Sequence, residues 1–576
     1  MQERTSTDLG AQGGATTMRE RPRVTGQGSA EFGQSAERTT TEVSDATETL
    51  LLFRTDMERE AERREREEAR LTRRRGIRRL VPYLPLLPVL AVQSYFAVRL
   101  MNGRTASVEE AGDLFAGHME IGHLLHGAPA SNYPTFFSGA PVLYPVAGAL
   151  IDSAHGLFAA RCLSLFFMLL ATIAVFRAGR RVYGMPAGLA AATLFSVLGP
   201  TLHLSSYATF DALALCLIAW SLYHTMSFAH GDSRNALIYA VGLMVLADCV
   251  KYAVLLWNPI IIGLVGVAGP GWSAWKVSRS WNVQRFALLS GTVLGVALLV
   301  GREPYFTGLT RTVKLAVYSN LIRGNVLSNV TTWIGPLLIL ALVGLLTLIW
   351  AARTDRAVFG PRAGTAVLLL LGGLAGPLYE LCVNTTLSLD KQVDIGAVFA
   401  AVPAGWLFAR AAQTARQPRT LTAALTAVLA FSAAVPLGID GVAQGTALAN
   451  AWPDSAEMIS VLRPLVHRGT ANYLTEDAMV PAYYIGSRVS WTQWHDTTSC
   501  AWSRNGTTLT GAAACKAAIQ ADYYSVIVLD YAETPKLDAA IYPAISPAGY
   551  RLQGSYTAPT SVGTRTFYVW ALTRTS

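Results

Sequence analysis

Ser107–Gly127 reads SVEEAGDLFAGHMEIGHLLHG, and Phe136–Pro145 continues with FFSGAPVLYP. Small and apolar residues in the first stretch recur at three- and four-residue steps: Ala111, Leu114, Phe115, Met119, Gly122 and Leu125. This spacing predicts a half-apolar helix that lies along a membrane interface rather than crossing the bilayer. Ser107 and Glu110 have the spacing of a capping box, so the helix should begin there.

This predicted helix carries the densest group of acids and histidines beside any apolar segment. Glu109 and Asp113 are one turn apart and should share its polar face. Two carboxylates at a bilayer surface make a candidate active site. Glu110 is also explained by capping alone, and Asp113 is also explained as a solvated helix face.

Composition places the chain in a membrane. Of 576 residues, 52% are hydrophobic and only 15% are charged, and uncharged apolar runs of near membrane length repeat many times. Eleven spans are predicted, at about 80–98, 157–176, 186–202, 208–226, 236–250, 253–268, 286–300, 333–352, 363–381, 395–409 and 421–437. The formal net charge of +9 is explained by arginines between the spans and a basic N-terminal arm, so it does not indicate nucleic acid as a partner.

The spans imply three regions. Residues 1–75 are polar, are expected to be disordered and cytoplasmic, and show no removable signal peptide. Residues 76–439 form the transmembrane domain, with a catalytic first outer loop at 101–156. Four of the five short linkers on the side of the N-terminus are rich in Arg or Lys, which predicts a cytoplasmic N-terminus. The composition, rich in Ala, Gly and Arg, is typical of a high-GC bacterium and indicates a plasma membrane. Residues 440–576 then lie outside the cytoplasm.

The C-terminal region has the pattern of a small α/β domain. Helices are predicted at about 454–468, 515–521 and 535–544, and strands at about 469–474, 523–529, 550–556 and 566–572. If the region is extracytoplasmic, a disulfide between Cys500 and Cys515 is favoured. It contains no glycine-rich phosphate loop and no metal-ligand spacing, so its role is open between substrate recognition and support.

Cations on the predicted outer side are candidates for binding a phosphate. They are Lys251, Arg302, Arg311, Lys314, Arg323 and Lys391. Ionisable residues at a membrane edge are functional candidates because their burial is costly. Lys251 is also compatible with snorkelling or with a pair to Asp248, and Arg311 and Lys314 with an ordinary interfacial helix.

Asp211 and a group of three histidines are further candidates for a functional role, and each has a simple structural explanation. Asp211 opens the fourth span, where the helix dipole favours an acid in any case. His118, His123 and His126 fit no standard metal-site spacing and are interpreted as surface histidines. A divalent metal is left open, and no residue is assigned to it.

The order of the motifs resembles the GT-C glycosyltransferases, and within them the protein O-mannosyltransferase and lipid A aminoarabinose transferase group. Glu109-Glu110-Ala111 stands where that group has Asp-Glu and a small residue, and Ser138–Pro145 resembles its Pro-Pro-Leu-Tyr segment, with Ala140 in place of the first proline and Val142 inserted. Arg180–Gly184 resembles the end of its second span, Tyr207–Asp211 resembles an outer turn bearing an acid, and Asp390-Lys391 stands where it often has a basic pair. The pattern covers about 80–437, with the specific motifs mainly in its first third.

The resemblance implies an all-α polytopic fold and a reaction. A sugar on a polyprenyl phosphate would pass, usually with inversion, to an acceptor hydroxyl of a protein, lipid or glycan at the outer membrane face. Glu109, Glu110 and Asp211 are then the catalytic candidates. Lys251, Arg311, Lys314 and Lys391 are the candidates for binding the donor phosphate. The alternatives are a transporter or lipid flippase, and a non-catalytic cell-envelope assembly protein. The sequence selects neither the sugar nor the acceptor.

Overall fold

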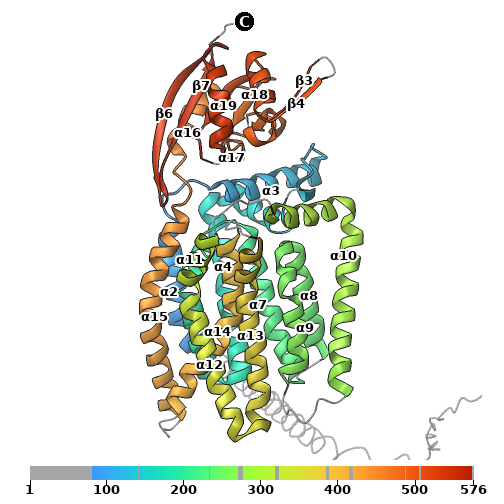
Figure 1. The fold of residues 1–576 in the computed structure, drawn as a ribbon, viewed down its shortest axis with the longest axis vertical. Helices are drawn as coiled ribbons and strands as arrows, with labels where there is room; N and C mark the ends of the chain where they lie inside the picture. Colours follow the sequence, from blue (N-terminus) through green and yellow to red (C-terminus); the bar gives the residue numbers. More distant parts are fainter. Residues whose placement is uncertain are drawn as a thin grey trace, which may run out of the picture. The chain divides into compact units, whose positions relative to one another are not determined.

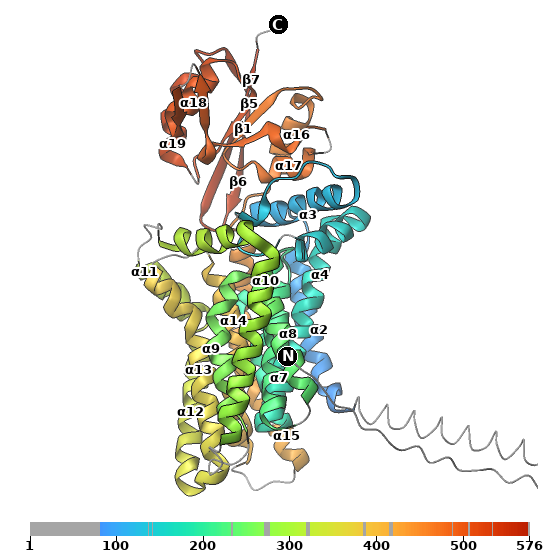
Figure 2. The ribbon, with the colours of Figure 1, turned by 90° about the vertical axis from the view of Figure 1, so that its right-hand side faces the viewer.

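The computed structural model describes residues 81–135, 137–140, 142–231, 234–269, 277–317, 323–383, 388–413, 419–486, 488–504, 507–532 and 534–573. The chain divides into the units Met1–Val81 and Pro82–Ser576, and the second unit is the subject below. The predicted disordered arm at 1–75 lies outside the described residues. Figures 1 and 2 show a helical bundle with a sheet-containing domain at one end.

The bundle follows the predicted apolar runs. Its elements are η1 (Val81–Leu86), α2 (Leu87–Met101), α4 (Tyr144–Tyr183), α5 (Met185–Ser196), α6 (Gly199–Leu204), α7 (Phe210–Ala229), α8 (Arg234–Val250), η3 (Tyr252–Trp257), α9 (Asn258–Val267), α10 (Val277–Val317), α11 (Arg323–Trp333), α12 (Gly335–Thr354), α13 (Arg356–Val383), α14 (Leu389–Gln413) and α15 (Arg419–Ala449). Within the described residues, eight helices are long and apolar enough to cross a membrane and three apolar helices are shorter. Each of the eleven predicted spans overlaps one of them, and the multi-pass membrane fold is confirmed.

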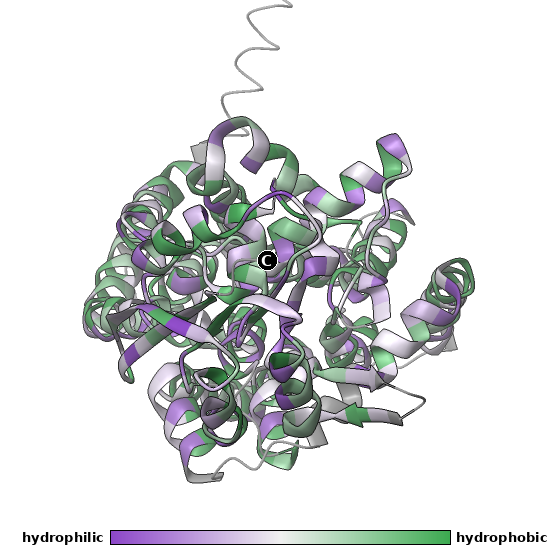
Figure 3. Cartoon of the chain, turned by 90° about the horizontal axis from the view of Figure 1, so that it is seen from above, coloured by the Kyte–Doolittle hydropathy of each residue, from purple (hydrophilic) through white to green (hydrophobic). Residues whose placement is uncertain are grey.

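Side-chain burial distinguishes the centre of the bundle from its rim. The apolar window of α14 is mostly buried, whereas that of α10 is mostly exposed. On α10, Leu288, Leu299 and Val300 are all more than half exposed, and hydrophobic residues recur along the outer helices seen from above (Figure 3). Such a rim is suited to contact with lipid.

One segment differs from its prediction. The span predicted at 286–300 is part of a longer helix, because α10 continues through Val317 with a non-helical break at Arg302, and α11 adds a further helix before the next predicted span. Arg302 has a positive φ of 58°, and the helix changes direction there, so that its last part lies across the bundle end (Figure 2).

The C-terminal domain is an α/β sheet with helices on both faces. Its strands are β1 (Asn472–Thr475), β2 (Trp494–Asp496), β3 (Ala501–Arg504), β4 (Thr507–Thr510), β5 (Tyr524–Leu529), β6 (Tyr550–Thr560) and β7 (Gly563–Leu572). The main sheet has the order β2-β1-β5-β7-β6. β1 pairs in parallel with β2 and β5, whereas β7 is antiparallel to β5 and β6. β3 and β4 form a separate hairpin.

The domain's helices complete its two hydrophobic cores. They are α16 (Ala456–Leu465), α17 (Met479–Ile485), α18 (Gly511–Gln520) and α19 (Pro535–Ile545), with short turns η5 (Trp491–Gln493) and η6 (Thr497–Ser499). α16 and α17 pack on one face of the sheet, and α18 and α19 pack on the other. Cys500 and Cys515 are joined by a disulfide, as predicted. α17, β2, β3 and β4 were not predicted, because each is too short to show a clear period.

Between the bundle and this domain lies α3 (Val108–His126), followed by η2 (Tyr133–Thr135) (Figure 1). The predicted start is confirmed: Ser107 is the N-cap and forms a capping box with Glu110. The expected interfacial position holds only for the end of the helix, where Leu124 and Leu125 are exposed. Ala111 and Phe115 instead pack into the core of the C-terminal domain, because protein covers this half of the helix on both sides.

Candidate functional site

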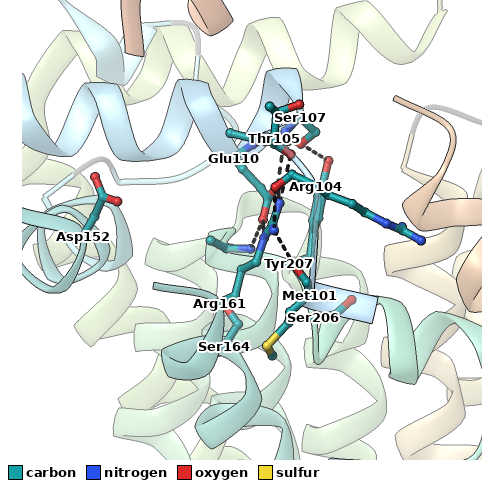
Figure 4. Close-up of polar contacts among 12 residues, drawn as sticks. Met101, Arg104, Thr105, Ser107, Glu110, Asp152, Arg161, Ser164, Ser206 and Tyr207 are labelled. Atoms are coloured by element: carbon teal, nitrogen blue, oxygen red, sulfur yellow. Dashed lines mark hydrogen bonds and ion pairs between the residues drawn. The ribbon is translucent and has the colours of Figure 1, made fainter. Parts of the chain in front are cut away.

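The N-terminus of α3 is fixed by a buried ion pair that the sequence reading missed. Arg161, on α4, contacts Glu110 through two nitrogens: Nε lies 2.8 Å from Oε1 and Nη2 lies 2.8 Å from Oε2. Both side chains are almost fully buried. The same guanidinium donates to the carbonyl oxygens of Met101, Arg104 and Thr105 (Figure 4). Arg161 therefore holds the segment that leads into α3.

Glu110 also fixes the turn that opens α7. Its carboxylate accepts hydrogen bonds from the backbone N–H of Ala208 at 2.9 Å and of Ser107 at 3.2 Å. With Arg161, these donors occupy both carboxylate oxygens. A charge held this way is suited to positioning the backbone, so these contacts give Glu110 a positioning role, while its predicted catalytic role stays a prediction.

Glu109 points instead into a row of charges, which we call the four-charge network: Glu109, Lys391, Asp211 and Lys251. Lys391 Nζ lies 2.7 Å from both carboxylate oxygens of Glu109 and 3.5 Å from Asp211 Oδ2. The other oxygen of Asp211 pairs with Lys251. The network joins α3, α14, α7 and the segment before η3, so it assembles residues that are far apart in the sequence.

Exposure differs sharply along this network. The side chain of Glu109 is 40% exposed, whereas those of Lys391, Asp211 and Lys251 are 9%, 3% and 4% exposed. Two carboxylates and two ammonium groups balance in charge, which lowers the cost of burying them. Glu109 is thus the most exposed member of the network, and the buried Lys391 is its direct partner.

Lys251 is placed by the segment that resembles the family's Pro-Pro-Leu-Tyr motif. Ala140 N donates to Cys249 O, and Tyr252 N donates to Ser138 O, both at 2.8 Å. Gly139 lies between these bonds against Val250, where an added Cβ would come within 1.8 Å of the carbonyl oxygen. The motif needs a glycine here because backbone meets backbone. The sequence alternative that paired Lys251 with Asp248 is not realised, because Asp248 accepts from Asn258 instead.

Gly139→Ala tests this placement. The added methyl group must push the Lys251 segment away, so we expect a destabilisation of about 2–3 kcal/mol together with loss of the enzymatic activity proposed below. Thermal unfolding of the purified protein measures the first effect. The matched control is Gly242→Ala on α8, where an added Cβ has no neighbour within 4 Å. Equal behaviour of the two variants would contradict the close approach.

Asp113 is buried, against the expectation of a solvated helix face. It is 4% exposed, and its Oδ2 accepts from the backbone N–H of Phe210 at 3.1 Å. Burial, reinforced by the nearby carboxylate of Asp211, raises the pKa of Asp113 well above its usual range. Asp113 and Glu110 together therefore hold the N-terminus of α7.

Further polar groups are buried on α14, next to Lys391 in the sequence, and on the neighbouring helices α6 and α13. His203 Nε2 lies 3.9 Å from Asp390 Oδ2, Thr201 donates to Asp394 at 2.5 Å, and Gln392 donates to Glu380 at 2.6 Å. Because burial of polar groups in a membrane bundle is costly, this end of the bundle is the candidate functional site.

The remaining predicted phosphate ligands are not joined to the network by any contact the structure describes. Arg311 is exposed on the last part of α10, and the side chain of Lys314 lies outside the described side chains. His118 pairs with Asp152 at 2.8 Å. Among the described residues, only Glu476, Asp530 and Asp538 in the C-terminal domain bring His, Cys or carboxylate atoms close enough for one metal ion.

Comparisons with known proteins place this geometry on a known fold. No protein-family profile and no curated protein sequence matches the chain. Among solved structures, ArnT from Cupriavidus metallidurans in the apo state is similar, with a TM-score of 0.52 and 12% identity over 84% of this chain and 97% of that one. The same protein bound to undecaprenyl phosphate gives a TM-score of 0.51 with the same identity and coverage.

A more distant similarity is to the oligosaccharyltransferase AglB from Archaeoglobus fulgidus in complex with an inhibitory peptide and a dolichol-phosphate. Its TM-score is 0.48, with 14% identity over 85% of this chain and 74% of that one. The chain thus has the GT-C glycosyltransferase fold, a multi-pass helical bundle with a small C-terminal α/β domain, as the sequence motifs predicted.

Proposed function

We propose that this protein is an integral-membrane glycosyltransferase that moves a sugar from a polyprenyl-phosphate donor to an acceptor hydroxyl at the outer face of the plasma membrane. The observation that carries the proposal is the contact of Lys391 Nζ with both oxygens of the half-exposed Glu109, at 2.7 Å. The similarity to ArnT bound to undecaprenyl phosphate supports a lipid-phosphate donor.

The two residues have complementary tasks in such a transfer. Glu109 accepts the proton of the acceptor hydroxyl as its oxygen attacks the anomeric carbon. The bond from that carbon to the phosphate oxygen breaks, and the lipid phosphate leaves with the bonding electrons. Lys391, with Lys251 behind it, stabilises the charge on this leaving group. A phosphate that takes over Lys391 also frees Glu109 to act as a base.

The remaining acidic residues of the site position the two lysines and the start of α7. Asp211 lies between the two lysines and keeps them apart in fixed positions. Glu110 and Asp113 fix the turn before Asp211 through the backbone N–H groups of Ala208 and Phe210.

The direction of the helices and the position of their arginines support an orientation in which α3 lies outside the cell. α4 leads away from α3 and ends at Arg180 and Arg181. The α12–α13 connection, with Arg353 and Arg356, lies at the end of the bundle away from α3 (Figure 1). Positive residues gather on the cytoplasmic side of membrane proteins, so we place α3 and the α/β domain outside the cell.

A transfer assay tests the function. Purified protein in liposomes is incubated with each of a panel of polyprenyl-phosphate sugars, labelled in the sugar, and with cell-envelope acceptor fractions. We expect label from one donor to leave the lipid extract as polyprenyl phosphate accumulates. Movement of intact donor across the bilayer without sugar release would support a flippase instead. Absence of both, with the fold intact, would favour an assembly protein.

A further inference from the structure

The segment that leads into α3 is bound from two sides. From the bundle, Arg161 donates to the carbonyl oxygen of Thr105 at 3.1 Å (Figure 4). From the C-terminal domain, the hydroxyl oxygen of Tyr484, on α17, accepts from the backbone N–H of Ala106 at 2.7 Å. This carbonyl group and this N–H belong to one peptide unit, which is planar and rigid. One hydrogen bond from the bundle and one from the domain therefore fix the orientation of the same plane.

The side chain of Thr105 adds a second connection to the domain. Its hydroxyl accepts from the backbone N–H of Ser455 at 2.9 Å and donates to the carboxylate of Asp454 at 3.1 Å. Ser455 is fully buried, and a buried backbone N–H needs a partner of this kind. Both residues lie directly before α16, whereas Tyr484 belongs to α17. Two separate elements of the domain thus hold the segment before α3.

Apolar contacts extend this attachment along the first half of α3. Ala106 and Ala111 are fully buried, and with Phe115 they belong to the hydrophobic core that α16 and α17 form on one face of the sheet. Gly486 directly follows α17, and a Cβ added to it would come within 2.9 Å of the ring of Phe115. The domain and the first half of α3 therefore share one packed core, which resists small displacements.

The proposed base lies close to these contacts. Glu109 is three residues after Ala106, and Ser107 between them is the N-cap of α3. The orientation of this first turn decides where the carboxylate of Glu109 lies relative to Lys391. A general base must lie within hydrogen-bond reach of the hydroxyl that it deprotonates, and a misplacement of about 1 Å can cost about 100-fold in rate. A shift of the peptide unit before Ala106 would therefore lower the rate of transfer.

We propose that the C-terminal domain is a positioning element of the transferase, and that Tyr484 is the positioning residue through which it sets the first turn of α3. Tyr484 acts through the backbone of Ala106 and is not itself a catalytic residue. The inference rests on the proposed function, because that function assigns Glu109 as the base. Of the two roles that the sequence leaves open for the domain, its contacts with α3 favour support over substrate recognition.

Tyr484→Phe tests this assignment in the full-length protein. The change keeps the ring and removes the oxygen that accepts from Ala106 N. We expect the turnover number for sugar transfer to fall about 10–100-fold. The Michaelis constant for the donor should change less than about twofold, because Lys391 and Lys251 lie on other elements. Hydrogen exchange followed by mass spectrometry should become faster in peptides that cover residues 104–112.

Tyr483→Phe is the matched control. The hydroxyl of Tyr483 donates to Asp152 on α4 at 2.8 Å, so this variant also loses one partly buried hydrogen bond of α17. Its thermal midpoint should fall about as much as that of Tyr484→Phe, while its turnover number and its exchange in residues 104–112 stay near those of the wild type. A merely structural role for Tyr484 predicts equal turnover in the two variants, and that result would overturn the proposal.

A pair of changes at Thr105 covers the case in which Tyr484→Phe does not fold. Thr105→Val removes the hydroxyl that contacts Ser455 and Asp454 and should lower turnover without raising the Michaelis constant for the donor, whereas the conservative Thr105→Ser should restore turnover. Unchanged exchange in residues 104–112 of both Thr105→Val and Tyr484→Phe overturns the proposal. If the wild type transfers sugar from no donor, the proposed function fails, and the exchange measurements still decide whether the domain holds this segment.

Discussion

Replacing Glu109 with Gln is expected to lower the turnover number for sugar transfer by about 10²–10⁴-fold, the usual contribution of a general base. Gln keeps the size and polarity of the side chain but has no basic oxygen for the hydroxyl proton. Because Glu109 is 40% exposed, loss of its ion pair should cost about 1 kcal/mol or less in stability. The variant should therefore fold and bind donor, yet transfer slowly.

The matched comparison is Lys391→Met. This change removes the ammonium proposed to bind phosphate, so the Michaelis constant for the donor should rise along with the loss of turnover. Glu109→Gln should leave the donor constant nearly unchanged. Steady-state kinetics at several donor concentrations separate the two patterns. Full activity of Glu109→Gln would exclude Glu109 as the base.

Much of the α3 region was predictable because its signals are local. The capping box of Ser107 and Glu110 lies within one turn, and the structure realises it. Glu109 was selected on the predicted interfacial helix, and Asp211, Lys251 and Lys391 were selected as charges beside the predicted spans, with the family resemblance adding to the choice of Glu109, Asp211 and Lys391. Their contact could not be read from the sequence, since Lys391 is 282 residues from Glu109 and nothing local relates them.

Other features of the molecule can be recognised only in the folded structure. Gly139 was identified only as part of the Ser138–Pro145 segment, and its close approach to Val250 could not be read from the sequence. Glu476 and Asp530 are 54 residues apart, so nothing local in the sequence relates them. Arg161 is different, because an arginine inside the second predicted span is a signal in its own right and was overlooked among the arginines at span ends.

Arg161→Met gives the largest expected effect on stability. It leaves the carboxylate of Glu110, which is 1% exposed, without its charged partner, and it removes the donor for the carbonyl oxygens of Met101, Arg104 and Thr105. Breaking a buried ion pair by removing one partner typically costs about 3–5 kcal/mol. We expect a clear fall in the thermal midpoint of the purified protein, with Arg99→Met, an exposed arginine on α2, as the unaffected control.

The double variant Arg161→Met with Glu110→Gln distinguishes the unpaired charge from lost packing. If the cost of Arg161→Met comes from the stranded carboxylate, neutralising Glu110 should recover part of the thermal midpoint, because the amide needs no cation. The amide oxygen can still accept from Ala208 N, so the turn before Asp211 should persist in the double variant. A double variant that is less stable than Arg161→Met by the full cost of Glu110→Gln alone would show that the two side chains act independently. The ion pair would then not be what fixes the start of α3.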